Sequence, residues 1–505
     1  MKVLSKTFGS LVAGALLLAA PAAAETVMFG GDASRNMASA EKGLPEKWNP
    51  ETGENIKWVV SLGSQSYSGP LVAGGKVFVG TNNDSVKNPK ITGDRGVLMA
   101  FSTADGKLLW QAARAKLSAG RVNDWPFQGI CSTPAVEGDR IYYVSNRGEL
   151  VASDTEGFLD QENDGPFQDE TDKGPTDEDV VWKLDMINEL GVYPHNMSAS
   201  SPLIVGDAVY IVTANGVDEG HINIPAPEAP SFIAVDKKTG KLLWASSLPG
   251  TKIMHGQWSS PSYGVIKGRP QVIFAGGDGW IYSFEPATGK LLWKFDCNPK
   301  DSVYRIGAGS TRNNVIAMPV IWDDKVYVGV GEDPEHGEGI GHLWAIDATM
   351  EGDVTGKAGI WHRDGEDFHR TLSTVAIADG IVYASDLSGY LYALDAKTGE
   401  HYWTYNAYAA IWGSPRVADG KIYLGDEDGD VAVLRTGKKL EVIGVINMGG
   451  AVYTTVAARD GVLYISSRNK LWAIEKGAHL KPSATGGAPS SPGAGEKTPA
   501  TKPPL

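Results

Sequence analysis

A short segment that ends in tryptophan recurs along this chain and constrains its fold more than any other feature. Thr-Gly-Lys-Leu-Leu-Trp occurs at residues 239–244 and 288–293, with looser copies at 104–110 and 395–403. Each copy places a glycine turn before a short apolar strand, a pattern that predicts a β-hairpin. One structural unit is therefore repeated around the molecule.

A second pattern completes the unit. Residues 201–212 read Ser-Pro-Leu-Ile-Val-Gly-Asp-Ala-Val-Tyr-Ile-Val, in which a glycine turn separates two apolar strands. Similar segments lie between the tryptophan copies, so each unit has two hairpins and four strands. A period of roughly 40 to 70 residues is typical of propeller blades.

Two independent counts give the number of units. The last strand of each unit is expected at Trp58, Trp110, Trp182, Trp244, Trp293, Trp361, Trp403 and Val442-Ile443. The first hairpin is expected to start near Ser68, Ser132, Ser201, Ser260, Met318, Ser373, Ser414 and Thr454. Both counts predict an all-β fold, an eight-bladed β-propeller of four-stranded antiparallel blades.

The ends of the repeat region predict how the ring closes. The chain opens with an isolated last strand at residues 56–61, and its final strand at 471–474 has no successor. We expect the N-terminal strand to complete the blade formed by the last three strands. A stack of solenoid coils is the alternative architecture, and the isolated first strand favours the closed ring.

The first residues have the form of an export signal. Lys2 and Lys6 precede an apolar stretch, and Ala22-Ala-Ala24 before Glu25 resembles a signal-peptidase site. The apolar stretch is too short to span a membrane. We expect a protein that is periplasmic or secreted after cleavage near Ala24.

The sequence predicts that the chain has four parts. Residues 1–24 are the signal peptide, residues 25–55 an N-terminal lead-in, and residues 56–476 the propeller. Residues 477–505 are rich in Pro, Ala, Gly and Ser and lack hydrophobic periodicity, so a disordered tail is expected.

Charge and cysteine content restrict the partners and the cross-links. A net charge of -14 makes nucleic acid and anionic membrane surfaces poor partners. Cys131 is expected on an innermost strand of the second blade, and Cys297 just past an outermost strand of the fourth. That separation is too large for a disulfide, so we expect two buried thiols.

The repeats resemble those of the pyrroloquinoline quinone (PQQ) repeat propellers. The resemblance rests on the tryptophan copies, on Tyr-Leu-Tyr-Ala-Leu-Asp at 390–395 and on the Ser-x-Pro starts, and it covers nearly the whole mature chain. That superfamily includes quinoprotein alcohol dehydrogenases and the propeller lipoprotein of the outer-membrane barrel assembly machine. Segments 43–48, 333–342, 368–371 and 426–430 further resemble exported bacterial propellers without an assigned reaction.

The resemblance implies two cofactors, PQQ and Ca²⁺. In quinoprotein alcohol dehydrogenases a vicinal disulfide covers the quinone, carboxylate and amide groups hold Ca²⁺, and a haem domain is often attached. This chain has no adjacent cysteine pair and no Cys-x-x-Cys-His segment. PQQ and Ca²⁺ therefore rest on the resemblance and on the residues at the mouth of the axial funnel.

The loops before the innermost strands are expected to ring that mouth. They supply Gln128, Asn196, His255, Trp258, Arg312, His369, Arg370, Trp412 and Tyr453. Arginine pairs with carboxylates, tryptophan and tyrosine stack on flat rings, and histidine moves protons near neutral pH. The set suits a flat polyanion such as PQQ, a sugar acid or a peptide, and such side chains also fill and hydrate a funnel that binds nothing.

Two loops have the residue types of metal ligands. Asp160, Glu162 and Asp164 before Gly165 match the first half of a calcium loop, although Thr171 stands where the last acid is expected. The second cluster has ligand types for Zn²⁺, namely Glu335, His336, Glu338 and His342. A solvated acidic insertion and a turn-rich connection are the respective structural alternatives.

The sequence is compatible with three functions. The first is a non-catalytic binding scaffold for a protein, peptide or glycan at the propeller face. The second is a PQQ- and Ca²⁺-dependent dehydrogenase, and the third is an envelope assembly factor. The specific motifs of the sequence describe the propeller framework and do not describe a catalytic site. The binding function is therefore favoured, and enzymatic activity is not.

Overall fold

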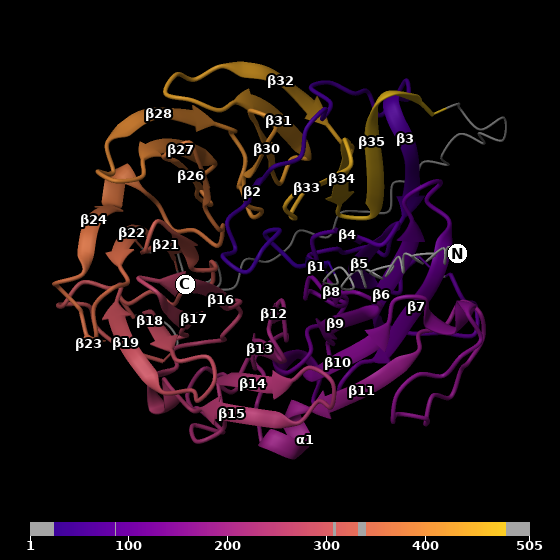
Figure 1. Ribbon diagram of the computed structural model, residues 1–505, viewed down its shortest axis with the longest axis horizontal. Helices are drawn as coiled ribbons and strands as arrows, with labels where there is room; N and C mark the ends of the chain where they lie inside the picture. The colour runs from indigo at the N-terminus through magenta and orange to yellow at the C-terminus, as the bar shows by residue number, and fades with distance from the viewer. Residues whose placement is uncertain (1–24, 86, 307–309, 332–339, 481–505) are drawn as a thin grey trace, which may run out of the picture.

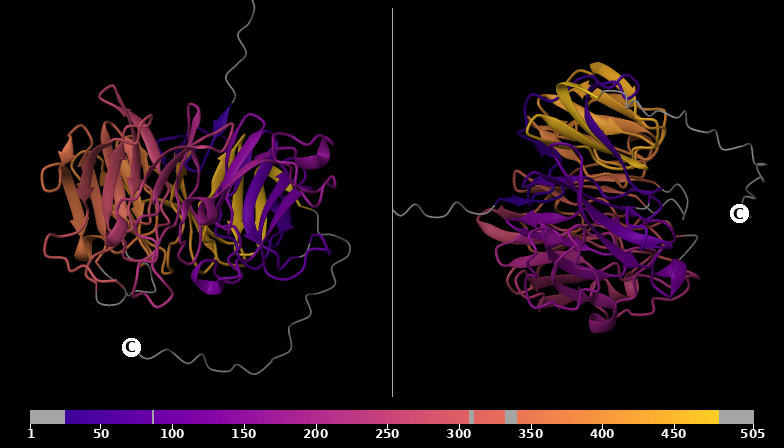
Figure 2. Two further views of the ribbon diagram at one scale, coloured as in Figure 1. Left: turned by 90° about the horizontal axis from the view of Figure 1, so that it is seen from below. Right: turned by 90° about the vertical axis from the view of Figure 1, so that its right-hand side faces the viewer.

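The computed structural model describes residues 25–85, 87–306, 310–331 and 340–480, which form a ring of eight blades (Figure 1). The chain passes around the ring in order, and in each blade the first strand lies nearest the axis. Seen from the side, the ring is a disc with loops on both faces (Figure 2). The predicted eight-bladed propeller is confirmed.

The first four blades follow one another along the chain, and their strands pair antiparallel in sequence order. Blade 1 contains β4 (Leu71–Ala73), β5 (Lys76–Asn82), β6 (Arg95–Ser102) and β7 (Leu108–Ala115). Blade 2 contains β8 (Ala135–Glu137), β9 (Arg140–Val144), β10 (Glu149–Asp154) and β11 (Val180–Asp185). Blade 3 contains β12 (Leu203–Val205), β13 (Ala208–Val212), β14 (Phe232–Asp236) and β15 (Leu242–Ser246). Blade 4 contains β16 (Ser262–Ile266), β17 (Arg269–Ala275), β18 (Trp280–Phe284) and β19 (Leu291–Asp296).

The other blades repeat this arrangement. Blade 5 contains β20 (Val320–Trp322), β21 (Lys325–Val330), β22 (His342–Asp347) and β24 (Gly359–Asp364). Blade 6 contains β25 (Ala376–Ala378), β26 (Ile381–Ser385), β27 (Tyr390–Asp395) and β28 (His401–Asn406). Blade 7 contains β29 (Arg416–Ala418), β30 (Lys421–Gly425), β31 (Asp430–Arg435) and β32 (Val442–Asn447). Blade 8 contains β33 (Ala457–Arg459), β34 (Val462–Ser467), β35 (Lys470–His479) and β3 (Glu54–Ser61).

Short elements lie outside the blades. Three two-residue strands, β1 (Thr26–Val27), β2 (Ala38–Ser39) and β23 (Gly352–Asp353), extend the sheets of blades 2, 7 and 4. Within the described residues the helices are α1 (Met186–Leu190) and the single-turn segments Gly120–Val122, Gly157–Leu159, Gly250–Lys252 and Gly365–Asp367. None of the helices in the described part of the chain has the length and apolar character needed to cross a bilayer.

Blade 8 joins the two ends of the repeat region. Strand β3 pairs antiparallel with β35, with Trp58 opposite Ala473 and Ser61 opposite Lys470. In Figure 1 the indigo β3 lies beside the yellow β35 at the seam. The N-terminal strand therefore closes the ring, as the sequence predicted.

The indole of Trp293 donates to Gln271 of its own blade at 2.7 Å, and the other six repeated tryptophans dock one blade on the next. Their indole nitrogens donate to backbone carbonyls of the turn between the last two strands of the following blade: Trp58 to Thr103, Trp110 to Thr155, Trp182 to Lys237, Trp244 to Pro286, Trp361 to Ala396 and Trp403 to Gly437, at 2.7–3.0 Å. The turn glycine lies against the same ring, and a Cβ on Gly240 would meet Trp182 at 2.6 Å. This contact explains why the turn and the tryptophan are repeated together.

A second set of contacts joins the inner edges of the blades. A backbone amide before one innermost strand donates to a hydroxyl at the matching position of the next blade. The bonds run from Gly69 to Thr133, Thr133 to Ser201, Ser201 to Ser260, Met318 to Thr374, Thr374 to Ser414 and Ser414 to Thr455, at 2.8–3.2 Å. The Ser-x-Pro starts are therefore part of the hydrogen bonding that surrounds the axis.

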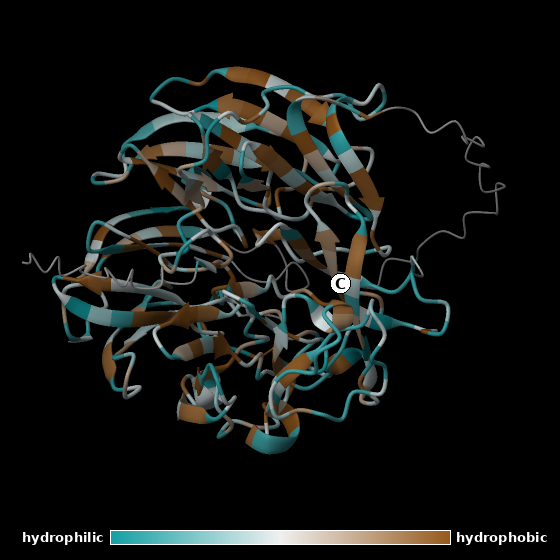
Figure 3. Ribbon diagram, turned by 45° about the vertical axis from the view of Figure 1, so that its right-hand side comes forward, coloured by the Kyte–Doolittle hydropathy of each residue, from teal (hydrophilic) through white to brown (hydrophobic). Residues whose placement is uncertain are grey.

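The strands supply the apolar core and the loops are polar, as the brown strands and teal connections of Figure 3 show. Both cysteines are free and buried, as predicted. The position predicted for Cys131 is wrong, because β8 begins only at Ala135. The preceding residues are held through side chains, and the Ser132 hydroxyl accepts from the Val144 amide and donates to the Ser200 carbonyl.

Candidate functional site

The open mouth of the axial channel is a cavity of about 370 Å³ to which all eight blades contribute. Each blade supplies residues from the loop before its innermost strand. The lining residues are Tyr67, Trp125, Gln128, Cys131, Asn196, Met197, Ala199, Trp258, Ile316, Leu372, Trp412 and Tyr453. Five of the nine residues predicted for the mouth are therefore in it.

The mouth is aromatic and apolar. Its tryptophan and tyrosine side chains are half-buried, so each presents part of a ring to the cavity. Tyr67 and Tyr453 stack with ring centroids 5.3 Å apart, and Trp412 meets Tyr453 edge-on at 5.8 Å. The Trp412 indole donates to Glu427 at 3.3 Å. Burial, followed by the nearby Cys131 and Tyr453, raises the pKa of Tyr67 to about 12, so its phenol stays protonated at neutral pH.

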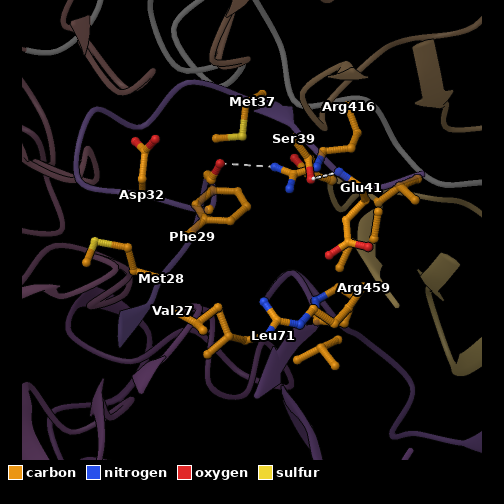
Figure 4. A pocket seen from close by; sticks show the side chains of 18 of the residues that line it. Val27, Met28, Phe29, Asp32, Met37, Ser39, Glu41, Leu71, Arg416 and Arg459 are labelled. Carbon is orange, nitrogen blue, oxygen red and sulfur yellow. Dashed lines mark hydrogen bonds between the residues drawn. The ribbon is translucent and has the colours of Figure 1, made fainter. Parts of the chain in front are cut away.

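The channel narrows behind the mouth and reaches the lead-in. A deeper cavity of about 160 Å³ is lined by Cys131, by hydroxyls of the inner ring and by Phe29. Phe29 also lines a separate cavity of about 250 Å³ on the other side, which Figure 4 shows with Arg416 and Arg459. Phe29 of the lead-in therefore borders both cavities.

Arg35 anchors the lead-in. Its side chain is fully buried, and its guanidinium donates to the carbonyls of Phe29, Ser201, Pro202 and Pro261 at 2.8–3.0 Å. Desolvation lowers the pKa of Arg35 to about 9, so the group is still charged at neutral pH. The lead-in is thereby tied to the inner ends of blades 3 and 4.

The other four residues predicted for the mouth lie outside its lining. The Arg312 guanidinium pairs with Asp296 at 2.6 Å and donates to the Asp278 carbonyl at 3.2 Å. Arg370 has a buried Nη1 without a hydrogen-bond partner among the described residues. These two arginines are not among the residues that line the described mouth, where they were expected to pair with carboxylates.

The two histidines predicted for the mouth have specific partners. Nδ1 of His369 lies 2.9 Å from a carboxylate oxygen of the fully buried Asp386. That oxygen also accepts from the Tyr392 hydroxyl at 2.8 Å. His255 lies behind the mouth, where its ring meets those of His195 and His221.

The second predicted metal cluster is only partly described. Glu335, His336 and Glu338 lie outside the described residues. His342 opens β22 and is buried, with Nδ1 3.1 Å from Nε2 of His362 and 4.0 Å from Asp364. Burial, followed by the neighbouring His362, lowers the pKa of His342 to about 4, so its imidazole is neutral at neutral pH.

The predicted calcium loop is organised around an arginine. Asp160 accepts from the amide of Glu162 at 3.0 Å, and Asp164 lies 2.8 Å from Nη2 of Arg140. Arg140 also pairs with Asp154 at 2.6 Å. Because Arg140 supplies the positive charge beside Asp164, the arrangement does not require a cation there, and calcium binding stays a prediction.

Sequence reasoning missed part of each site. The loops that precede the innermost strands were identified, but two of their aromatic residues, Tyr67 and Trp125, were missed. Because only polar and aromatic residues were selected, Met197, Ile316 and Leu372 were missed as well. His195 stands directly before a predicted mouth residue, a signal that could have found it. His221 lies in a loop between two strands, with no local spacing that relates it to His195.

The family comparison agrees with this architecture. The family model described as outer membrane protein assembly factor BamB matches residues 21–174, 94–332 and 277–440. The chain belongs to the PQQ-repeat β-propeller family. The resemblance inferred from the tryptophan repeats is thus confirmed.

Relatives of this PQQ-repeat propeller include dehydrogenases. The dehydrogenase subunit of the quinone-dependent alcohol dehydrogenase of Komagataeibacter europaeus is 26% identical over 290 residues, which are 47% of this chain and 39% of that protein. The quinoprotein alcohol dehydrogenase PedE of Pseudomonas putida is 30% identical over 100 residues, 19% of this chain and 12% of that protein. The matched segments therefore span well under half of these relatives.

Solved structures share the propeller fold. A europium-containing methanol dehydrogenase superposes with a TM-score of 0.57 at 14% identity, covering 89% of this chain and 97% of that one. BamB from Moraxella catarrhalis superposes with a TM-score of 0.51 at 17% identity, covering 85% of this chain and 99% of that one. At such low identity these likenesses show the fold alone.

Proposed function

We propose that this PQQ-repeat propeller is an exported binding protein that takes a protein, peptide or glycan ligand in its channel mouth. The observation that carries the proposal is that five partly exposed aromatic side chains line the mouth, namely Tyr67, Trp125, Trp258, Trp412 and Tyr453. Aromatic rings provide large contact area at low entropic cost, and they stack on sugar rings or on the side chains of a peptide.

Polar groups in the lining add orientation to this contact. Gln128 and Asn196 present amides beside the aromatic rings, and the neutral phenol of Tyr67 is a further donor. A mostly apolar lining with a few polar groups is typical of ligand pockets. The smaller cavity behind the mouth, about 160 Å³ in volume and bordered by Phe29, limits how far a ligand can enter.

The described mouth does not fit PQQ as a bound polyanion. None of the described residues that line it is Lys or Arg, and the charge of Arg312 is already paired with Asp296. The alternative function, a PQQ- and Ca²⁺-dependent dehydrogenase, is supported by the names of the curated relatives. The further alternative, an envelope assembly factor with a protein partner, is supported by the description of the family model.

Export belongs to the same proposal. The signal-like residues 1–24, with cleavage near Ala24, and residues 481–505 of the predicted tail lie outside the described residues. The start predicted for the tail is wrong, because residues 477–479 belong to strand β35. The described chain begins at Glu25, which pairs with Arg459. Fractionation of the native host should recover the mature chain from the periplasm or the medium.

Ligand binding can be tested with peptide and oligosaccharide arrays, followed by calorimetry of each hit. Trp412→Ala and Tyr453→Ala should weaken binding at least tenfold, because aromatic anchors dominate such contacts. Tyr408→Ala is the matched control, since Tyr408 is 88% exposed and lies outside the mouth. Equal affinity of all three variants, or no ligand on either array, would overturn the proposal.

The alternatives have their own readouts. PQQ titrated with Ca²⁺ and followed by dye reduction with an alcohol panel separates the dehydrogenase from the other two functions. If the protein binds PQQ and reduces the dye, and Trp412→Ala abolishes both, the dehydrogenase replaces the binding function. Co-purification of an outer-membrane assembly complex from the native envelope would instead favour the third function.

A further inference from the structure

Three imidazole rings converge behind the wall of the channel mouth. His195 precedes β12, His221 lies in the loop between β13 and β14, and His255 precedes β16. Nε2 of His221 lies 3.1 Å from Nε2 of His195 and 3.0 Å from Nε2 of His255. The three nitrogens lie within 4.8 Å of one another, with His195 and His255 buried and His221 half-buried.

The orientation of His195 is fixed by its other ring nitrogen. Nδ1 lies 2.8 Å from the carbonyl oxygen of Val217, which can only accept a hydrogen bond. Nδ1 therefore carries a proton, and in the neutral tautomer with this proton the lone pair of Nε2 is directed toward His221. A backbone carbonyl that fixes the tautomer in this way is the usual outer partner of a metal-binding histidine.

The backbone holds the loop of His221 in place. Asp218 accepts from the amides of Ile222 and Asn223 at 2.8 and 3.2 Å, and the Val217 amide donates to the carbonyl of His255 at 3.2 Å. His221 itself has a φ of 51°, in the left-handed region that costs a non-glycine residue energy. The chain thus maintains an unfavourable conformation that turns this ring toward the other two.

A close backbone approach completes the arrangement. A Cβ on Gly216 would lie 2.5 Å from Cβ of His195, so glycine is required where the loop passes that residue. The His195 amide also donates to the Ala214 carbonyl at 3.1 Å. His195 and the loop that carries His221 are therefore held together through the backbone as well as through their rings.

We propose that His195, His221 and His255 bind a divalent transition-metal ion of the zinc class. Zinc–nitrogen bonds of about 2.0–2.1 Å in tetrahedral geometry place ligand nitrogens about 3.3–3.4 Å apart. The two short separations of 3.0 and 3.1 Å differ from that spacing by a few tenths of an ångström. Imidazole ligands suit zinc, copper and nickel, whereas calcium and magnesium prefer oxygen.

Hydrogen bonds among the three rings explain these contacts less completely than a bound metal ion does. A neutral His221 has at most one proton on Nε2, and that proton faces two other Nε2 atoms. A cation at the centre interacts favourably with all three lone pairs. The second histidine cluster is a weaker candidate, because it has two imidazoles and Asp364 lies 3.9–4.0 Å from them.

The proposed metal site shares a wall with the channel mouth. The indole of Trp258 donates to the His195 carbonyl at 3.1 Å, and its ring lies edge-on to His255 at 5.0 Å. Trp258 also lines the mouth. Metal binding would hold this aromatic wall in position from behind, whether or not the mouth binds a ligand.

The test is a zinc and cobalt titration of the purified mature chain after treatment with a chelator. We expect one equivalent of Zn²⁺ to bind in competition with a chromophoric chelator, and Co²⁺ to give the visible absorption of a tetrahedral site. His221→Ala should weaken zinc binding at least 100-fold and abolish that absorption. His401→Ala, which removes an exposed histidine from the rim of blade 6, should bind like the wild type.

Two further variants make the outcome decisive. His255→Gln should lose zinc as His221→Ala does, and circular dichroism together with the unfolding midpoint will show whether each variant is folded. His362→Ala should retain the ion. The proposal is overturned if the wild type binds no zinc, if His221→Ala and His401→Ala bind it equally, or if only His362→Ala loses it.

Discussion

Substitution of Arg35 provides a quantitative test of how strongly this residue anchors the lead-in to the propeller. Its guanidinium is fully buried, makes four hydrogen bonds to carbonyl oxygens, and has no carboxylate within ion-pair distance among the described residues. We predict that Arg35→Met lowers the free energy of unfolding. Methionine fills much of the same volume, so the change removes mainly the charge and its bonds.

Two opposing terms set the size of the effect. Each carbonyl left unpaired in the interior costs about 1–3 kcal/mol, so four of them cost about 4–12 kcal/mol. Removing the buried charge relieves a penalty of roughly 5 kcal/mol, which corresponds to the fall of the Arg35 pKa from its ordinary value to about 9. From the middle of that range, about 8 kcal/mol, the balance is a loss of about 3 kcal/mol.

Urea unfolding followed by tryptophan fluorescence and by circular dichroism measures this loss, and coincident curves verify that the transition is two-state. Arg269→Met is the control, because Arg269 pairs with Glu351 at the exposed surface and its loss should change stability by less than about 1 kcal/mol. Hydrogen exchange should also become faster at residues 29–37. A stabilised Arg35→Met variant would show that the burial penalty of the guanidinium exceeds the value of its bonds.

Two other substitutions test the packing of the blades and the titration of a buried histidine. Gly240→Ala should destabilise the chain by about 2–3 kcal/mol, because its Cβ would meet the Trp182 ring at 2.6 Å. Gly206→Ala is the control and should cost about 1 kcal/mol, since Gly206 has a similar positive φ but open space around it. Equal losses in urea unfolding would exclude the packing explanation. In the folded chain the pKa of His342 is about 4, below the ordinary value near 6.5. The unfolded chain therefore binds the proton more readily. The stabilisation that neutral His342 contributes to the folded chain is lost as the pH falls from 6.5 to 4. The wild type should lose about 3 kcal/mol relative to His342→Gln over that range, and a constant difference between the two chains would contradict the assignment.

The sequence predicted the blade number and the closing strand because these follow from local pattern. Alternating apolar strands and a Thr-Gly turn are properties of a few consecutive residues, and repetition fixes how many units there are. The docking role of Trp182 could also be inferred, since seven of the eight blades carry a tryptophan at the same place. Its specific partner, the turn carbonyl of Lys237, became visible only when adjacent blades were in contact.

The composition of the mouth was only partly predictable. Loops before innermost strands were the correct segments, yet the direction of each side chain depends on the path of its loop. Trp412 turns into the cavity, whereas Arg312 turns to Asp296, and nothing in the local sequence distinguishes these outcomes. Partners that lie in neighbouring loops decide them.

The sequence by itself therefore determined the repeated framework: eight blades, their order and the strand that joins the ends. Only the tertiary structure decided which side chains from distant loops come together on that framework. It brought His221 to 3.1 Å from His195 and 3.0 Å from His255, and it bonded Arg35 of the lead-in to the carbonyl of Ser201. The physical reason is that strands and turns are selected by neighbouring residues, whereas the meeting of distant loops depends on the packing of whole blades.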